Sequence, residues 1–319
     1  MSDGNVARPR RSRFKRTVSD RIQLTSDDLA IIDHVGRRRF LATAQLFRLF
    51  PSRSPQNLRW RLAKLFDAQY LDRPRAQINH YSSSVNSSMV HALGNKGAEL
   101  FARRQCIAPP LTDWTDKNRS LTRPYIEHAL LVADVMIGLE PILQTRADLT
   151  VLQDAALRAL LPTTRFRSSN PWSLSARIAQ HGKYQTISIA PDAAFAIQFL
   201  TFDRRSHFFL EADRATMPIE RSSLSQSSFR RKLEVYLAVH RAKEHVQRFG
   251  FQNLRVLTVT TSMERIQSML AVVKAITAGK GHGMFLFTDV ATLAKYSNPL
   301  TVPWITTNGT ARIDVPPRS

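Results

Sequence analysis

The sequence is poor in cysteine, in acidic residues and in long apolar runs. Its one cysteine, Cys106, excludes an internal disulfide framework and every cysteine-rich zinc site. No Cys-His signature surrounds this thiol, which favours an inert side chain over a nucleophile. No uncharged apolar run approaches the roughly 20 residues of a membrane helix, and the N-terminal MSDGNVARPRRSRFKR lacks the apolar core of a secretion signal. We therefore expect a soluble, cytoplasmic protein with no membrane partner.

The scarcity of acidic residues leaves a large positive charge. Against 25 Asp and Glu stand 46 Lys and Arg, a formal net charge of +21. Such an excess attracts polyanions, and nucleic acid is the commonest polyanion inside a cell. An anionic membrane surface is the alternative, but no basic amphipathic helix with a large apolar face supports it.

At 319 residues the chain is long enough for one or two hydrophobic cores. Composition shifts along the chain favour two, and we expect five parts. These are a disordered basic arm over 1–21, a DNA-binding domain over 22–105, a linker over 106–122, a mixed-sheet α/β domain over 123–300, and a C-terminal tail over 301–319.

The arm carries much charge and little that could be buried. Such a segment can dock on phosphates or enter a minor groove, and a solubilising tail is the alternative. Its basic residues are Arg8, Arg10, Arg11, Arg13, Lys15 and Arg16.

Three helix signals follow the arm. The first helix is expected over 26–36 with Thr25 or Ser26 as its N-cap, and a second, short one begins at the cap Thr43. The third begins after the cap Ser54, with a proline at its first position. Its buried face is expected to hold Leu58, Leu62, Leu65 and Phe66.

The opposite face of the third helix is polar and basic. Two strand-forming pieces follow, YLDRPR and MVHALG, joined by a Ser- and Asn-rich segment that contains His80. Two short helices, a polar third helix and a hairpin predict a winged helix-turn-helix whose third helix enters the major groove of DNA. A winged helix used for protein contacts is the alternative. Gln56, Asn57 and Arg59 are expected to meet base edges, and Lys64, Arg73 and Arg75 to meet phosphates. Trp60, on the same face of the third helix, is also expected to bind DNA.

Strands and helices alternate in the second half of the chain. Four strand-forming pieces come first: LTVLQD, YQTISIA, PDAAFAIQF and SHFFLEADR. A long helix is expected next, over 226–249. It is followed by the strand LRVLTVTT, a helix over 262–278 and the strand GMFLFTD. This order predicts a mixed sheet flanked by helices, in the α+β or α/β class.

Three carboxylates occur where two of these strands meet. Asp192 opens one strand, while Glu211 and Asp213 share one face of the next because side chains alternate along a strand. Hairpin pairing could bring Asp192 near Glu211, and the three would then suit Mg²⁺ or Mn²⁺, which prefer carboxylate ligands. The alternative is a structural ion-pair network with Lys232, Arg230 or Arg231.

The dipeptide PD before one strand and a glutamate on the next resemble the PD-(D/E)xK nuclease superfamily, whose fold is restriction-endonuclease-like. The resemblance implies a metal held by the aspartate and glutamate that activates water, assisted by a lysine two residues past the glutamate. Here that position is Asp213. Lys232, with Tyr236 one turn on, could substitute from the next helix.

A wider pattern spans about residues 22–290 and includes LGNKGAELF, EHALLVADV, PDAAF, FFLEADRAT and KLEVYLAV. This pattern resembles the replication-relaxation family of bacterial plasmids and integrative elements. The resemblance implies control of replication or DNA relaxation and a winged helix joined to a nuclease-like domain. It points to His128, Asp192, Glu211, Asp213, Thr216, Lys232 and Tyr236.

His128 has two interpretations. Its apolar neighbours favour a core histidine, and a proton carrier or DNA contact beside the carboxylates is the alternative.

The sequence thus predicts a double-stranded-DNA-binding protein that controls replication or transcription of a mobile element, with a degenerate nuclease-like domain. A Mg- or Mn-dependent nuclease that nicks or cleaves DNA is the first alternative, and an adaptor that recruits other proteins is the second. Replication or conjugation proteins and a second copy of the chain are the further candidate partners.

Overall fold

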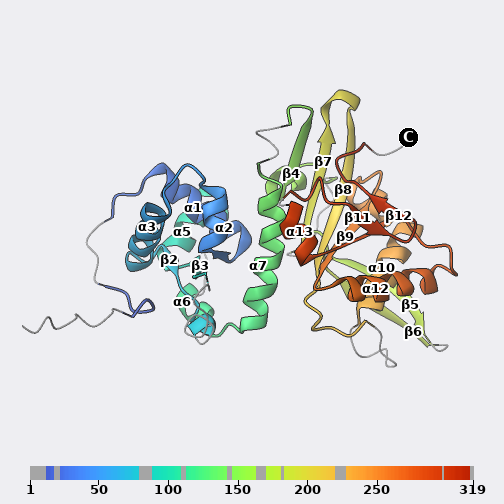
Figure 1. Cartoon of the computed structure of the whole chain (residues 1–319), viewed down its shortest axis with the longest axis horizontal. Helices are drawn as coiled ribbons and strands as arrows, with labels where there is room; N and C mark the ends of the chain where they lie inside the picture. The colour runs from blue at the N-terminus through green and yellow to red at the C-terminus, as the bar shows by residue number, and fades with distance from the viewer. Residues whose placement is uncertain are drawn as a thin grey trace, which may run out of the picture. The chain divides into compact units, whose positions relative to one another are not determined.

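Helices and strands occupy most of the chain in a computed structural model, which describes residues 12–17, 22–78, 88–108, 113–141, 146–162, 170–180, 183–219, 228–296 and 298–316 (Figure 1). The chain divides into two units, Met1–Ala133 and Asp134–Ser319. The division falls within one helix, α7 (Arg123–Gly138).

The first unit begins with two helices whose caps differ in kind. Helix α1 (Ser26–Arg38) is capped by Thr25, whose hydroxyl accepts from Asp28 N at 3.3 Å while the Asp28 carboxylate accepts from Thr25 N at 2.7 Å. In helix α2 (Thr43–Leu49) the Gln45 side chain accepts from Ala42 N at 2.9 Å. Thr43 is therefore the first helical residue and not the cap that the sequence predicted, because its hydroxyl donates instead to Met89 O.

Helix α3 (Pro55–Asp67) agrees with the sequence prediction in its start and its buried face. The Ser54 hydroxyl accepts from Asn57 N at 3.2 Å, and proline occupies the first helical position. The buried side chains are Leu58, Leu62, Leu65 and Phe66.

A small antiparallel sheet completes this part of the first unit. Its strands are β1 (Leu41–Ala42), β3 (Val90–Leu93) and β2 (Leu71–Asp72), in that order. The strands β2 and β3 are the two predicted strand-forming pieces. Most of the segment between them, residues 79–87 with His80, lies outside the described residues. The short helical segment η1 (Arg75–Gln77) lies between β2 and β3, and the helices α5 (Asn95–Arg104) and α6 (Trp114–Arg119) follow β3.

Helix α6 lies within residues 106–122, which the sequence predicted to be a linker. Asn118 of this helix is 1% exposed and donates to Asp72 at 3.0 Å and to Leu93 O at 2.9 Å. Two satisfied hydrogen bonds make burial of its amide favourable, so this helix packs on the small sheet.

Residues 12–17 of the arm, predicted to be disordered, also pack on the first unit. The Arg16 guanidinium donates to Phe66 O at 3.0 Å, to Leu71 O at 3.1 Å and to Asp72 Oδ1 at 2.9 Å. Thr17 N donates to Asp67 Oδ1 at 2.9 Å. A guanidinium carries five donors in a fixed fork, which is why one arginine can satisfy three acceptors from separate residues.

His91 in β3 makes the first unit sensitive to acid. It is 1% exposed and lies 3.0 Å from the Thr43 hydroxyl, and burial, with a smaller contribution from Arg73, lowers its pKa to about 3. In the unfolded chain this imidazole takes up a proton near its ordinary pKa of about 6.5, whereas in the folded chain it stays neutral. Protonation therefore favours the unfolded chain, and the stability present above about pH 6.5 is lost as the pH falls toward the folded pKa. We expect the free energy of unfolding to fall by about 2 kcal/mol between pH 7 and pH 5 on account of His91.

Urea unfolding of the wild type and of His91→Gln at both pH values measures this effect. Glutamine keeps a hydrogen-bonding side chain but does not titrate. Equal pH dependence in the two proteins would contradict the assignment to His91.

The second unit is built on a seven-stranded mixed sheet. Strands β8, β9 and β10 are parallel, and the other neighbours pair antiparallel. This confirms the predicted α+β class with a mixed sheet. The strands in spatial order are β12 (Gly309–Ala311), β11 (Trp304–Thr306), β10 (Phe285–Asp289), β9 (Arg255–Thr260), β8 (Arg204–Ala212), β7 (Ala193–Phe199) and β4 (Leu149–Gln153).

Residues 301–316, within the segment predicted to be a tail, therefore supply the edge strand β12 and its neighbour β11. Trp304 is fully buried, and its indole donates to Pro299 O at 3.0 Å. Gly309 has a φ of 113°, a value that residues with a side chain rarely adopt. This turn lets β12 return along β11.

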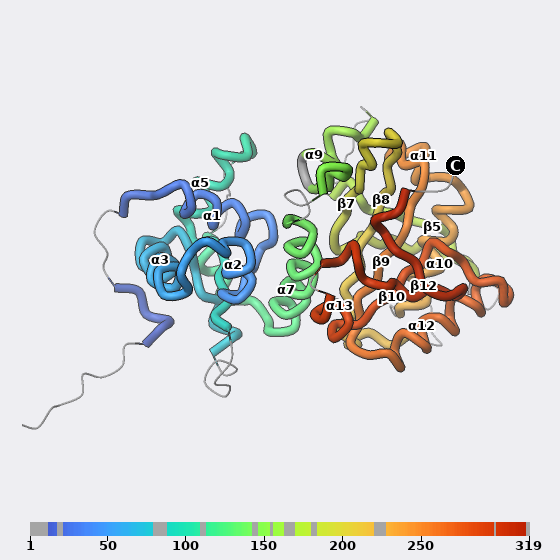
Figure 2. Tube along the Cα trace, turned by 45° about the horizontal axis from the view of Figure 1, so that its top comes forward, coloured from blue at the N-terminus to red at the C-terminus, as the bar shows by residue number. Residues whose placement is uncertain are grey.

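Helices cover the sheet of the second unit. Figure 2 shows α10 (Phe229–Arg241) beside α12 (Met263–Ile276) and β5 (Leu174–Gln180). β5 forms a separate hairpin with β6 (Lys183–Ile189), which also contacts α10. One core of buried side chains joins them, including Leu174, Phe209, Tyr236, Met269 and Phe285.

The helix predicted over 226–249 is interrupted. It consists of α10 and α11 (Glu244–Phe249), because Lys243 has the left-handed φ of 55°. The other helices in the described residues are α9 (Asp154–Arg158), η2 (Leu200–Phe202) and α13 (Val290–Tyr296). None of the helices that the structure describes is both long and apolar enough to cross a membrane.

Candidate functional site

The outer face of α3 gathers five of the residues that the sequence predicted for DNA. All five side chains are exposed, and Trp60 is 58% exposed. The Arg59 guanidinium lies 4.9 Å from the centre of the Phe47 ring, and Lys64 Nζ lies 5.5 Å from the centre of the Trp60 ring. The Lys64–Trp60 contact lies along α3, whereas the Arg59–Phe47 contact directs the arginine toward α2. Both long side chains remain exposed. We call this the α3 face: Gln56, Asn57, Arg59, Trp60 and Lys64.

A buried ion pair fixes α3 against α1. Arg61 Nε donates to Asp28 Oδ1 at 2.6 Å, Arg61 Nη2 donates to the other oxygen of the same carboxylate, and it also donates to Gln23 O at 2.6 Å. Asp28 is fully buried, and although burial raises its pKa, the hydrogen bonds from Arg61 and Thr25 lower it overall. Sequence reasoning missed this pair, which positions the helix that carries the α3 face.

The two predicted phosphate contacts after β2 differ from one another. The Arg73 guanidinium lies 4.2 Å from the centre of the Phe66 ring and donates to Arg13 O, so this side chain is half-buried under the arm. Arg75 is exposed as predicted. The difference arises because residues 12–17 pack against Arg73, which the sequence predicted to meet a DNA phosphate.

In the second unit, strand pairing brings Asp192 beside Glu211 as the sequence predicted. The register pairs Ala193 with Leu210, and Asp192 N donates to Leu210 O at 2.9 Å. The Asp192 carboxylate accepts from Ala212 N at 2.8 Å. Asp192 therefore lies at the end of β7, level with Glu211 on β8.

Both oxygens of Glu211 accept hydrogen bonds from α10. Lys232 Nζ lies 2.6 Å from Oε2, and the Tyr236 hydroxyl donates to Oε1 at 2.5 Å. Glu211 is 2% exposed, and burial raises its pKa to about 7, with Lys232 opposing and Asp192 adding to the rise. Burial alone would lower the pKa of Lys232, but Glu211 and Asp192 raise it overall. Glu211 is thus a buried acid paired with Lys232, whose side chain is 26% exposed.

Asp213 has different partners, which sequence reasoning missed. Arg265 Nη2 donates to Oδ1 at 2.8 Å, and Arg265 Nε donates to Oδ2. The Thr260 hydroxyl donates to Oδ2 at 2.6 Å, and Arg265 also donates to Met217 O at 2.6 Å. This carboxylate is satisfied by the end of β9 and the first turn of α12.

The three carboxylates do not fit Mg²⁺ or Mn²⁺ as they lie. Every carboxylate oxygen of Glu211 and Asp213 accepts from a protein donor, and two of these donors are cationic. In the described ranges no group of three His, Cys, Asp or Glu side chains is arranged to hold a metal ion. The geometry favours the structural network that the sequence left as the alternative. Lys232 is one of the network partners that it named for Glu211.

His128 lies on α7, in the first unit, and is half-buried. Asp192, Glu211, Asp213 and Lys232 belong to the second unit. The predicted role of His128 beside the carboxylates stays a prediction.

Comparison with known sequences gives one informative match. A family model described as replication-relaxation matches residues 32–254, more than half of the chain. This range includes the α3 face and the carboxylates Asp192, Glu211 and Asp213. No curated protein and no solved structure matches the chain.

Proposed function

The chain belongs to the replication-relaxation family, which indicates a role in plasmid or mobile-element replication, and from that premise we propose that it binds double-stranded DNA through the α3 face to control replication or transcription. In this proposal the first unit is a winged helix and the second is a nuclease-like domain whose carboxylates serve structure. The order α1, β1, α2, α3, β2, β3 supports the winged helix, since a short helix precedes the candidate recognition helix and a hairpin follows it.

The α3 face is the observation that carries the proposal. Amide side chains such as Gln56 and Asn57 can pair with adenine, and the guanidinium of Arg59 can pair with guanine, in the major groove. Lys64 suits a phosphate, and the net charge of +21 supplies attraction that does not depend on sequence.

Arg59→Ala is expected to weaken binding to a specific duplex by roughly 5–150-fold, corresponding to the loss of one bidentate base contact. Lys64→Ala is expected to weaken binding to all duplexes alike and to reduce the salt dependence by about one unit of slope. Fluorescence anisotropy with duplexes from the replication region of the element measures both. Arg103→Ala is the matched control, because Arg103 on α5 has a side chain 77% exposed and lies outside the α3 face.

Three results would contradict this proposal. An unchanged affinity of Arg59→Ala for the specific duplex would show that the α3 face does not recognise DNA bases. Nicking of supercoiled plasmid with Mg²⁺ or Mn²⁺, lost in both Asp192→Ala and Glu211→Ala, would replace regulation with nuclease activity. Capture of replication or conjugation proteins without DNA, by a chain that does not bind DNA, would favour an adaptor.

A further inference from the structure

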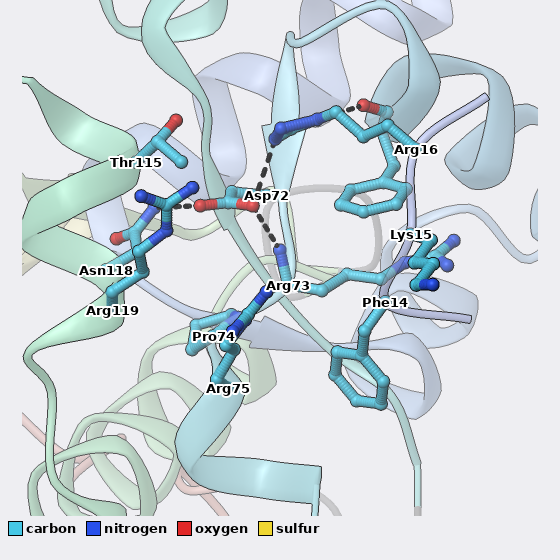
Figure 3. Close-up of a pocket in the computed structure, with 11 residues that line it drawn as sticks. Phe14, Lys15, Arg16, Asp72, Arg73, Pro74, Arg75, Thr115, Asn118 and Arg119 are labelled. Atoms are coloured by element: carbon cyan, nitrogen blue, oxygen red, sulfur yellow. Dashed lines mark hydrogen bonds and ion pairs between the residues drawn. The ribbon is translucent and has the colours of Figure 1, made fainter. Parts of the chain in front are cut away.

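A pocket in the first unit lies where three separate segments of the chain meet. Its volume is about 340 Å³, and it is lined by residues 14–16, by Phe66 with residues 72–75, and by α6 (Figure 3). This volume is at the small end of the range for ligand pockets, which begins near 300 Å³. The pocket could therefore hold a small polar group such as a phosphate or a nucleotide.

The lining of this pocket is strongly cationic. Among the lining residues that the structure describes, five are Lys or Arg and one is Asp, a formal excess of four positive charges. Figure 3 shows Arg16, Arg73 and Arg119 around Asp72. Such a concentration of one sign favours an anionic ligand. The five cations are Lys15, Arg16, Arg73, Arg75 and Arg119.

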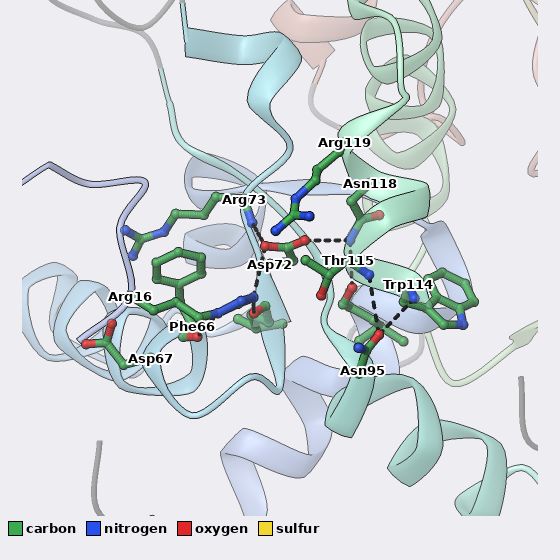
Figure 4. Close-up of polar contacts among 12 residues, drawn as sticks. Arg16, Phe66, Asp67, Asp72, Arg73, Asn95, Trp114, Thr115, Asn118 and Arg119 are labelled. Carbon is green, nitrogen blue, oxygen red and sulfur yellow. Dashed lines mark hydrogen bonds and ion pairs between the residues drawn. The ribbon is translucent and has the colours of Figure 1, made fainter. Parts of the chain in front are cut away.

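The single acid is already neutralised and satisfied. Asp72 Oδ1 accepts from Arg16 at 2.9 Å and from Arg73 N at 2.9 Å, and Oδ2 accepts from Asn118 at 3.0 Å (Figure 4). The pair of Asp72 and Arg16 fixes the wall of the pocket. Asp72 offsets one of the five positive charges of the lining.

Two of those cations can turn to a ligand at little cost. Arg75 is exposed. Arg119 pairs with Asp116 at 2.7 Å, but the two side chains are 60% and 67% exposed, and such surface pairs contribute about 0–1 kcal/mol. Arg73 donates to the backbone carbonyl of Arg13.

We propose that this pocket binds a phosphate group, and that in the working protein it is a backbone phosphate of the DNA that the α3 face reads. Guanidinium groups match phosphate oxygens two at a time, which favours phosphate over a smaller or neutral ligand. Phe66 belongs to the last turn of α3, so the pocket lies at the carboxyl end of the same helix. That the bound phosphate belongs to DNA rests on the proposed function. A free phosphate ion would present the same chemical group to the pocket.

The test uses the full chain with Arg75→Ala and Arg119→Ala combined. Duplex binding is measured by anisotropy over a series of KCl concentrations. The control is Arg103→Ala, which removes an exposed arginine outside the pocket. Each lost phosphate contact is expected to reduce the slope of log affinity against log salt by about 0.9, without changing the preference among duplexes. Thermal unfolding of the variant confirms that it folds.

A second arm measures the thermal shift caused by inorganic phosphate against chloride at equal ionic strength. If the slope is reduced in the double variant but not in Arg103→Ala, the result supports a DNA phosphate in the pocket. An unchanged slope, with phosphate stabilising the wild type but not the double variant, overturns the DNA source and leaves a free-phosphate site. If neither effect appears, the pocket proposal is overturned. If the wild type does not bind DNA, the proposed function fails, and the phosphate arm alone decides on the pocket.

Discussion

Asp28→Ala is expected to lower the free energy of unfolding of the first unit by about 3–5 kcal/mol, because it leaves the Arg61 guanidinium without its buried partner. The change also removes half of the capping box with Thr25 at the start of α1. Hydrogen exchange in peptides covering Ser26–Arg38 and Pro55–Asp67 measures the loss where it occurs. Peptides of the second unit should keep their protection.

Asp27 gives a matched control for this experiment. It occupies the same first turn of α1 and also pairs with an arginine, Arg53, but the two side chains are 30% and 55% exposed. Exposed pairs of this kind contribute about 0–1 kcal/mol, so Asp27→Ala should change stability little. Equal losses in Asp27→Ala and Asp28→Ala would show that burial of the Asp28 pair is not the cause.

Lys232→Met is expected to lower the free energy of unfolding by about 3 kcal/mol at pH 8, because Glu211 then has no cationic partner in a buried site. At pH 5.5 the loss should be smaller. Burial already raises the pKa of Glu211 to about 7, and removing Lys232 raises it further. An acid whose pKa is raised on folding costs stability above its unfolded pKa, and this cost shrinks as the pH falls through the folded value.

The double variant Glu211→Gln with Lys232→Met is the control for the charge. It leaves no unpaired carboxylate, so it should recover part of the stability at pH 8 and show less pH dependence than Lys232→Met. Urea unfolding at pH 8 and pH 5.5 measures the free energy of unfolding of the wild type, of Lys232→Met and of the double variant. A loss in Lys232→Met that is the same at both pH values would contradict the role of the Glu211 charge.

The sequence predicted those elements that are determined by residues close to one another in the chain. Helix α3 followed from its cap Ser54 and from leucines at helical spacing, because both signals lie within one helix. The shared face of Glu211 and Asp213 followed from the alternation of a strand. The neighbourhood of Asp192 followed from the hairpin of β7 and β8.

Contacts between distant segments were not predictable in the same way. Arg265 lies 52 residues after Asp213, and the sequence offered nearer cations on α10 as partners. One signal could have found it: β9 runs parallel to β8, so the helix after β9 begins at the edge of the sheet where Asp213 lies. The edge hairpin of β11 and β12 also had a signal, the Asn308-Gly309 pair between two strand-forming pieces.

Asp72 joins the arm, the chain after β2 and α6 through one carboxylate. These contacts are in the same small network, so a ligand that strengthens one of them changes the free energy of the others. Coupling of this kind is reciprocal: if a group bound by the arm changes the affinity for a second group at α6, the second changes the affinity for the first by the same factor. A single side chain thus makes three segments of the first unit thermodynamically dependent on one another.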